Sequence, residues 1–352
     1  MKRPKQQQHS STAPDLLALS EFVERFAGKR IVVLGDFVTD SFQYGDITRV
    51  SREAPVLILR HRETRSLPGG GANATNNFAA LGAHVSPITA VGDDPAGDWL
   101  LHTFRAMHLD VSGILRIKGG ITPTKTRFLA GWAHTVGQQV LRVDYEPHAQ
   151  ITAAHQKKIL QLLNAKLRKA DALAISDYGF GVATPQTVKA ALTRSRRTMP
   201  VSLDSRYQLT AYKRSGVTTA TPNEAEIEAL HNTVIGQNLS QLERCGRQVL
   251  SDMKLRSLVI TRGKDGMALF QPAQPTAHIP VHGSDQAVDV TGAGDTVLAA
   301  YTLSLAVGAS PIEAAHIANI AGGLVVMKRG TATVSRHELL EAIRKAASEV
   351  AT

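Results

Sequence analysis

Short apolar segments rich in β-branched residues alternate with amphipathic helical patterns along most of the chain. Parallel strands need a crossover between them, usually a helix, so this alternation predicts an α/β fold with a mostly parallel sheet and helices on both faces. In such sheets ligands bind at the carboxyl ends of the strands. The segments that read as a buried strand with the polar residues after it are 31–36, 84–94, 172–179, 200–206, 218–226 and 257–266.

Two stretches break the alternation. Residues 41–62 and 115–143 have β-type patterning without a clear helix between their strands. We expect them to form a small separate sheet that covers the site as a lid. With 352 residues and no internal repeat or linker, one large domain over residues 15–352 is expected to carry this lid. Residues 1–14 are basic and polar, without the apolar core of a signal peptide, and are expected to be a disordered tail.

The charge of the chain narrows the class of ligand. The 40 Lys and Arg against 30 Asp and Glu give a formal net charge of +10, but the basic residues are scattered and aromatics make up only 5%. We therefore expect no nucleic-acid partner and favour small polyanionic substrates. A single cysteine fits a reducing cytoplasm, and the apolar run 296–309 is too short for membrane insertion.

The segment DVTGAGD, residues 289–295, has the composition of an anion site. Gly292, Ala293 and Gly294 carry little or no side chain, so their N–H groups can converge on a phosphate at the start of the apolar helix that follows. A carboxylate would repel that phosphate unless a hydroxyl lay between them, so Asp295 suits a base that deprotonates an attacking hydroxyl. The alternative is that Asp295 is only a helix N-cap.

Two further motifs extend this hypothesis. In TPNEAE, Asn223 and Glu226 are three residues apart and could order nucleotide phosphates and the water bound to Mg²⁺, or could simply cap a helix. In PGGGANAT, glycines precede Asn73, and with Asp36 and Asp40 this segment suits a polyhydroxylated ligand. The alternative for these glycines is a flexible connection.

The motifs PGGGANAT, TPNEAE and DVTGAGD occur in this order, and residues 30–334 resemble the ribokinase (PfkB-type) carbohydrate kinase family. The resemblance implies a ribokinase-like central sheet, flanked by helices, with a small β-sheet lid. KTRFLAGWAHTVGQQVLRVDYE and KRGTATVS are similar to the kinase domain of bacterial D-glycero-β-D-manno-heptose 7-phosphate kinases. Those enzymes phosphorylate the anomeric hydroxyl to give the 1,7-bisphosphate, in ADP-heptose and lipopolysaccharide core biosynthesis. Many are fused to an adenylyltransferase with an H-x-G-H motif, which this chain lacks, so it resembles the stand-alone kinase.

The resemblance implies a role for each matching residue. Asp295 would be the general base, and the N–H groups of the Gly292–Gly294 segment would stabilise the transferred phosphoryl group. Asn223 and Glu226 would organise ATP and Mg²⁺, the latter through water. The nucleotide site would also include Thr261, Gly263 and Asn319. The sugar would contact Asp36, Asp40, Gly69, Gly70 and Asn73. The candidates for the 7-phosphate are Arg127, Arg142, Arg206 and Lys213.

The sequence departs from this subfamily at two positions. Arg52 stands where Pro is expected, and Arg206 where Lys is usual. The family also implies a homodimer through the lid. Other hypotheses remain open: another sugar kinase of the family, of the ribokinase or fructokinase type, or a non-catalytic sugar-phosphate sensor. Ribose and fructose carry no phosphate. The dependence of binding on a substrate phosphate therefore distinguishes a heptose 7-phosphate kinase from a kinase of the ribokinase or fructokinase type.

Overall fold

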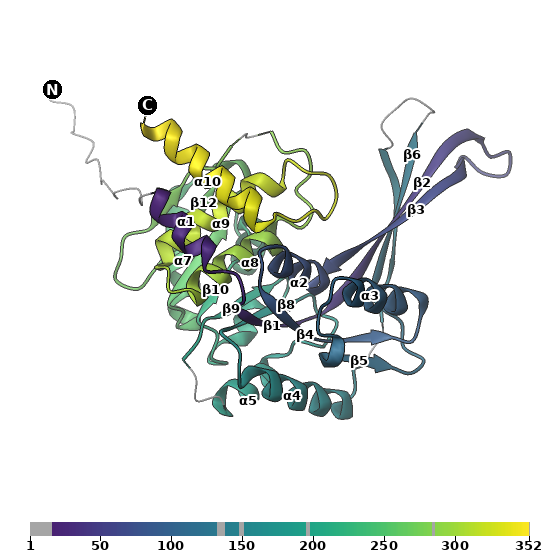
Figure 1. Ribbon diagram of the computed structural model, residues 1–352. Helices are drawn as coiled ribbons and strands as arrows, with labels where there is room; N and C mark the ends of the chain where they lie inside the picture. The colour runs from purple at the N-terminus through teal and green to yellow at the C-terminus, as the bar shows by residue number, and fades with distance from the viewer. Residues whose placement is uncertain (1–15, 132–137, 148–150, 195–197, 284–285, 352) are drawn as a thin grey trace, which may run out of the picture.

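The computed structural model describes residues 16–131, 138–147, 151–194, 198–283 and 286–351. The segment 1–14, expected to be a disordered tail, lies outside these residues. A nine-stranded sheet between helical layers forms the body, and a separate four-stranded sheet extends from it (Figure 1). The expected α/β fold is therefore confirmed.

The main sheet has the strand order β13-β12-β11-β10-β9-β8-β1-β4-β5. Pairing is parallel from β11 to β5, and only β12 and β13 join antiparallel at one edge. The strands are β1 (Arg30–Gly35), β4 (His84–Gly92), β5 (Ile114–Ile117), β8 (Ala172–Asp177), β9 (Val201–Ser205), β10 (Thr219–Ala220), β11 (Ser257–Thr261), β12 (Met267–Phe270) and β13 (Ala277–Ile279).

Strand β1 shows why this sheet needs two helical layers. Ile31 and Val33 pack into one buried cluster, whereas Val32 and Leu34 pack into another, because successive side chains point to opposite faces. The first cluster is covered by α1 (Leu16–Glu24), α2 (Gly71–Ala80), α8 (Ala293–Ala306), α9 (Pro311–Val325) and α10 (Arg336–Ala351). The second is covered by α4 (Ala153–Leu167), α5 (Pro185–Arg194), α6 (Glu224–His231) and α7 (Leu239–Met253). Helix α3 (Pro95–Ala106) packs on Phe37 and Val91 in a smaller cluster.

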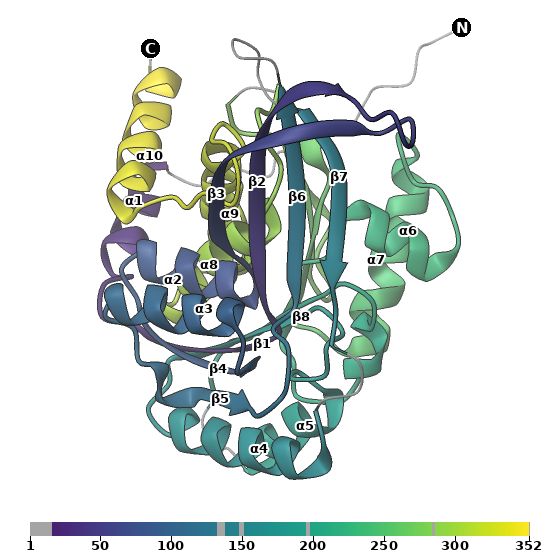
Figure 2. The same ribbon diagram turned by 90° about the vertical axis from the view of Figure 1, so that its right-hand side faces the viewer.

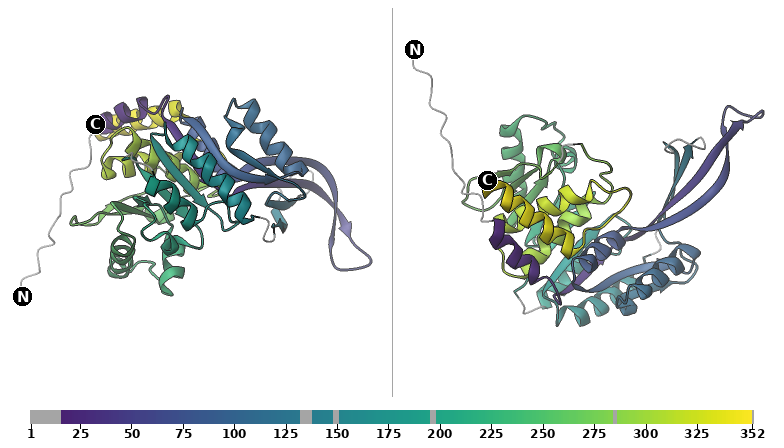
Figure 3. Two further views of the ribbon diagram at one scale, coloured as in Figure 1. Left: turned by 90° about the horizontal axis from the view of Figure 1, so that it is seen from below. Right: turned by 45° about the horizontal axis from the view of Figure 1, so that its top comes forward.

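The second sheet has the order β3-β2-β6-β7 and projects away from the body (Figures 2 and 3). It consists of β2 (Phe37–Val50), β3 (Leu57–Gly70), β6 (Thr124–Gly131) and β7 (Gln138–Tyr145). These bounds differ from the expected lid ranges 41–62 and 115–143. Strand β3 continues to Gly70, and β5 pairs with β4 in the main sheet, because a short apolar strand carries no sign of the sheet it joins.

The carboxyl ends of the parallel strands meet the base of the second sheet. Strand β1 ends at Gly35 and β2 begins two residues later at Phe37, so the chain passes directly from one sheet into the other. Helices α2 and α8, whose contacts with each other are extensive, both begin at this edge. Within the described residues no helix is long and apolar enough to cross a membrane.

Candidate active site

A cavity of about 510 Å³ lies at the carboxyl ends of β8, β9 and β11. It contains the glycine-rich loop, the candidate base and most of the expected nucleotide residues. The residues that carry the argument are Tyr178, Asp204, Arg206, Asn223, Glu226, Thr261, Gly292, Gly294 and Asp295. Two of the motifs, TPNEAE and DVTGAGD, therefore meet in this cavity, and Asn73 of the third bonds to Asp295 although 222 positions separate the two residues.

Asp295 lies in the first turn of α8 and is 3% exposed. Its Oδ2 accepts a hydrogen bond of 2.7 Å from Nδ2 of Asn73 in α2, and its Oδ1 has no partner within the described part of the chain. Gly292, not Asp295, occupies the N-cap position. The alternative in which Asp295 is only an N-cap is therefore wrong.

Burial raises the pKa of Asp295 to about 7. The bond from Asn73 opposes that rise, the charge of Asp40 adds to it, and the charge of Lys125 lowers it. Burial also raises the pKa of Asp204, which Glu226 and Asp295 push in the same direction. Carboxylates that gather at one buried edge raise each other's pKa, and a cation or a hydroxyl proton between them would relieve the repulsion.

The glycine-rich loop is shaped by contact with α2. Gly292 has φ +79°, and a Cβ there would lie 2.5 Å from Nδ2 of Asn73, so a side chain would displace the group that bonds Asp295. The N–H of Ala293 donates to the carbonyl of Val290 at 3.3 Å. Of the three expected N–H groups, only those of Gly292 and Gly294 have no acceptor among the described residues. The N–H of Ala293 is therefore engaged, and those of Gly292 and Gly294 are the two left to meet an anion.

Asn223 and Glu226 form a capping box at the start of α6. The side chain of Asn223 accepts from the N–H of Glu226 at 2.8 Å, and Glu226 Oε2 accepts from the N–H of Asn223 at 3.0 Å. The capping alternative is thus present in the structure. Both residues also line the cavity. Burial raises the pKa of Glu226, and a cation near the free lone pairs of its carboxylate would offset that effect.

The remaining nucleotide candidates spread away from Asp295. Thr261 lines the same cavity, and Gly263 follows it in an exposed turn. Asn319 lies on α9 and donates from Nδ2 to the carbonyl of Pro280 at 2.8 Å. It lines a separate cavity of about 670 Å³ with Val281 and His282. Helix α9 packs beside α8, but no residue of α8 lines this second cavity.

Asp36 has a different environment from the one expected. Its carboxylate accepts the backbone N–H groups of Tyr178, Phe180 and Val182 at 2.9, 3.1 and 2.9 Å, and the residue is 1% exposed. Burial raises its pKa to about 7, against the effect of these three bonds. Both oxygens are thus engaged, and Asp36 anchors the loop after β8 instead of facing a sugar.

Asp40, also expected to contact the sugar, is paired. Its Oδ1 forms an ion pair with Arg127 across β2 and β6, and both side chains are mostly buried. Gly69 allows this approach, because a Cβ there would overlap the Asp40 carboxylate. Gly70 follows at φ +54° and leads into α2, which carries Asn73. The PGGGANAT glycines therefore shape a close approach and do not form a flexible connection.

The four expected phosphate ligands do not converge. Arg127 is held by Asp40, and Arg142 forms two bonds of 2.9 Å to Asp144 on its own strand. Lys213 pairs with Asp252 at 3.6 Å near the end of α7, which precedes β11 and so lies at the opposite edge of the sheet. Lys213 is therefore wrong as a ligand at this site. Only Arg206 lines the cavity.

Sequence reasoning missed Lys125 and Tyr178. Lys125 Nζ lies 5.5 Å from the centre of the Tyr178 ring, and that ring lines the cavity. Tyr178 is the residue whose N–H binds Asp36, so the anchored loop carries it to the site. The only signal in the sequence was that Lys125 and Arg127 are two apart on a strand and hence share a face.

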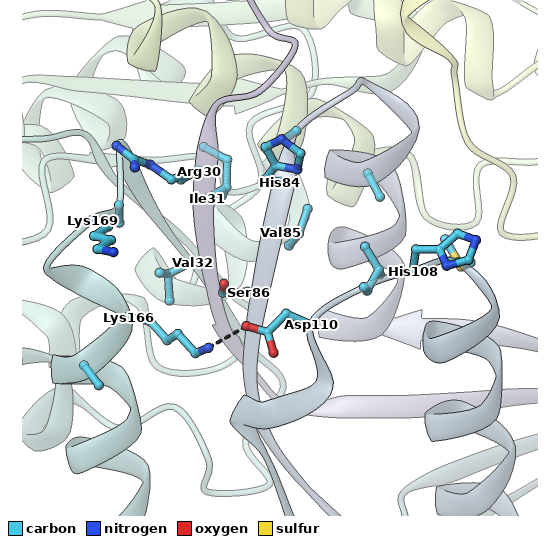
Figure 4. Close-up of a pocket in the computed structure, with 16 residues that line it drawn as sticks. Arg30, Ile31, Val32, His84, Val85, Ser86, His108, Asp110, Lys166 and Lys169 are labelled. Carbon is cyan, nitrogen blue, oxygen red and sulfur yellow. Dashed lines mark hydrogen bonds and ion pairs between the residues drawn. The ribbon is translucent and has the colours of Figure 1, made fainter.

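A larger cavity, of about 810 Å³, lies at the opposite edge of the sheet and is no candidate for this chemistry (Figure 4). It is lined by the start of β1 and β4 and the end of α4. Lys166 points across it to Asp110, and these two side chains form an ion pair. It contains neither the glycine-rich loop nor Asp295.

Comparison with known families and proteins identifies the family of the chain. A family model described as pfkB family carbohydrate kinase matches residues 29–338. The bifunctional protein HldE of Geobacter metallireducens is 39% identical over 311 residues, which cover 88% of this chain and 62% of that protein. Its counterpart from Geobacter sulfurreducens is 38% identical over 310 residues, with the same shares covered. The chain thus spans less than two thirds of the length of these relatives.

Solved structures show the same fold at low sequence identity. Arabidopsis thaliana ribokinase, complexed with ribose and ATP, superposes with a TM-score of 0.70 at 19% identity, over 90% of this chain and 99% of that one. Escherichia coli phosphofructokinase-2, in complex with fructose-6-phosphate, gives 0.72 at 18% identity, over 92% and 100%.

Proposed function

Because the chain belongs to the pfkB family of carbohydrate kinases, we propose that it phosphorylates D-glycero-β-D-manno-heptose 7-phosphate on its anomeric hydroxyl. ATP is the phosphoryl donor, and the products are ADP and the 1,7-bisphosphate, a precursor for ADP-heptose and the lipopolysaccharide core. Similarity to two proteins named HldE supports this choice of sugar over others in the family.

The unpartnered Oδ1 of Asp295 is the observation on which the proposed chemistry rests. Asn73 fixes the carboxylate through Oδ2, which leaves Oδ1 to accept the proton of the sugar hydroxyl. The hydroxyl oxygen then forms a bond to the γ-phosphorus of ATP as the bond from that phosphorus to the bridging oxygen of ADP breaks. The N–H groups of Gly292 and Gly294, at the positive end of α8, stabilise charge on the moving group.

The residues at the cavity also fit a divalent cation held through water. Glu226 and Asp204 both have pKa values raised by burial, and Asp204 also by the charge of Glu226, which a cation would offset. The described residues contain no group of three acidic, His or Cys side chains arranged to hold a metal directly. Mg²⁺ bound to ATP phosphates and to water on Glu226 would supply positive charge to the phosphates.

The neighbouring cavities suggest how the substrates lie. The nucleotide extends from Asn223 and Thr261 towards the cavity beside Asn319. The sugar lies on the other side of Asp295, against Asn73 and Asp40. The second sheet then covers it as a lid and excludes water that would otherwise accept the phosphoryl group.

A second candidate is a kinase of an unphosphorylated sugar. It is favoured by one observation, that Arg127, Arg142 and Lys213 are all engaged by carboxylates and are not gathered at the cavity. A non-catalytic sensor is less favoured, since the candidate base, the loop and the capping box are assembled together. We propose the cytoplasm, where ATP is available, as the location of the reaction.

Asp295→Asn tests the proposed base. The amide keeps the shape and can still accept from Asn73, so the site should stay assembled while the proton acceptor is lost. We expect turnover to fall about 10²–10⁴-fold with Mg·ATP affinity within about twofold of the wild type. Steady-state ADP release and nucleotide titration measure the two quantities. Near-normal turnover in this variant would show that Asp295 is structural.

A further inference from the structure

Two cations at the candidate site have no carboxylate partner. Lys125 lies on β6 at the base of the second sheet, and Arg206 lies directly after β9 and lines the cavity. Within the part of the chain that the structure describes, neither forms an ion pair. Both contact aromatic rings instead: Lys125 lies over Tyr178 and Arg206 over Tyr207. Lys125 is half-buried, and such cations are normally paired, so its arrangement requires a reason, whereas Arg206 is exposed at the cavity.

The carboxylates nearest to Lys125 are already engaged. Lys125 is opposite Asp40 on β2 and opposite Asp144 on β7 in the strand register. Asp40 binds Arg127, and Asp144 binds Arg142. The ammonium group is thus left without a direct anion, although it lies in a row of charged side chains.

The charges of Lys125 and Arg206 act on each other. Burial lowers the pKa of Lys125, and repulsion from Arg206 lowers it further. The ring of Tyr178 lies beneath Lys125 and lines the same cavity as Arg206. The same ring is close enough to Asp295 for that charge to raise its pKa, after the larger effect of burial. Arg206 therefore lines the cavity that contains the proposed base, and Lys125 adjoins this cavity through the Tyr178 ring.

We propose that Lys125 and Arg206 together bind the phosphate that the sugar substrate already carries, and that they set the preference for a phosphorylated sugar. This inference rests on the proposed function. Two positive charges match a phosphate dianion, and an ammonium beside a guanidinium supplies both a point charge and a planar pair of donors. The transferred phosphoryl group has its own donors in the loop before α8, so these cations remain for the second phosphate.

The two positive charges give the site its selectivity. A phosphorylated sugar gains from both when its phosphate binds. A sugar without phosphate gains nothing from them. If Lys125 and Arg206 bind the substrate phosphate, the chain can act on a heptose phosphate although Arg127, Arg142 and Lys213 are all paired with carboxylates.

The test compares one sugar with and without its phosphate. We would measure kcat and KM for D-glycero-D-manno-heptose 7-phosphate and for the unphosphorylated heptose, using Lys125→Met, Arg206→Met and the wild type. Lys213→Met is the matched control, because it removes a cation that lies away from the cavity. Each site variant should raise KM for the heptose phosphate about 10–100-fold and lower the ratio of its kcat/KM to that of the unphosphorylated heptose by a similar factor. Any effect of Lys125 on the pKa of Asp295 is common to both sugars and leaves this ratio unchanged. The control should change neither.

Two results would overturn the inference. Equal losses on both sugars would mean that the cations act on the transferred phosphoryl group, and unchanged kinetics would mean that they bind no substrate anion. Circular dichroism and Mg·ATP affinity identify any variant that fails to fold, and Lys125→Gln and Arg206→Gln then replace it. If the wild type rejects heptose phosphate, the proposed substrate fails separately, and the same series is run with fructose 6-phosphate against fructose. A wild type that turns over only unphosphorylated sugars contradicts the inference itself.

Discussion

Asp295 combines two properties that usually oppose each other, since it is almost fully buried and is proposed to act as a charged base. The bond from Asn73 partly stabilises the carboxylate, and the unpaired Oδ1 leaves it incompletely satisfied. A base needs a pKa near the working pH to accept a proton and release it again. Burial gives Asp295 a pKa of about 7, which suits that task.

The pH dependence follows from this value. Asp295 must be deprotonated to accept a proton, so kcat/KM should rise about tenfold per pH unit below pH 7 and level off above about pH 8. The measurement is kcat/KM for the sugar between pH 5.5 and 8.5 with Mg·ATP saturating. Nucleotide affinity measured over the same range serves as the control for ionisation of ATP. A flat profile through pH 7 in the wild type would contradict the assignment.

The motifs that the sequence could reveal are those whose geometry is local. DVTGAGD predicted a loop, a helix start and a carboxylate within seven residues, and the structure has all three. The partners of Asp36 and Asp40 could not be predicted in the same way, because they lie 142 and 87 positions along the chain. Lys213 was wrong as a ligand because its partner, Asp252, lies near the end of α7 at the opposite edge of the sheet, and the sequence carries no sign of this long-range pairing.

At the scale of single elements, α6 shows how one pair of residues can serve two purposes. Asn223 and Glu226 satisfy the backbone N–H groups at the start of the helix, and they also line the cavity. A capping box of this kind fixes both side chains before any nucleotide arrives. The sequence predicted the pair but left open whether it caps or binds, since both hypotheses need the same spacing.

Two substitutions of Asn223 separate these purposes. Asn223→Ser keeps an N-cap acceptor but shortens the side chain, so stability should change by less than about 0.5 kcal/mol while Mg·ATP affinity falls. Asn223→Ala removes the cap and should also lower the free energy of unfolding by about 0.5–2 kcal/mol. Urea denaturation and nucleotide titration measure the two effects. If Asn223→Ser bound Mg·ATP as tightly as the wild type, the residue would be only a cap.

The molecule consists of a body, in which helices cover both faces of the nine-stranded sheet, and a projecting four-stranded sheet (Figures 1 and 2). The edge strands of the projecting sheet, β3 and β7, are unpaired on their outer sides among the described residues. This sheet exposes apolar side chains, among them Val50 at 57%, Leu57 at 45% and Leu141 at 54%. Exposed edges and apolar surface favour association, because both are otherwise liabilities in solution. A homodimer through this sheet remains our proposal.

The dimer can be tested without reference to activity. Leu141→Glu places a charge on the exposed part of β7 without touching a buried contact, and should shift the chain towards a monomer. Sedimentation velocity at micromolar concentration measures the change, with Leu17→Glu on α1 as the control at another exposed apolar residue, 58% accessible. A wild type that sediments as a monomer would refute the proposal.

The identity of the product tests the central claim most directly. We would incubate the wild-type chain with Mg·ATP and D-glycero-β-D-manno-heptose 7-phosphate and follow phosphorus NMR. The account predicts stoichiometric ADP and a second sugar phosphate resonance coupled to the anomeric proton, with neither formed by Asp295→Asn on the same timescale. Phosphorylation of an unphosphorylated sugar alone, or at a hydroxyl other than the anomeric one, would contradict it.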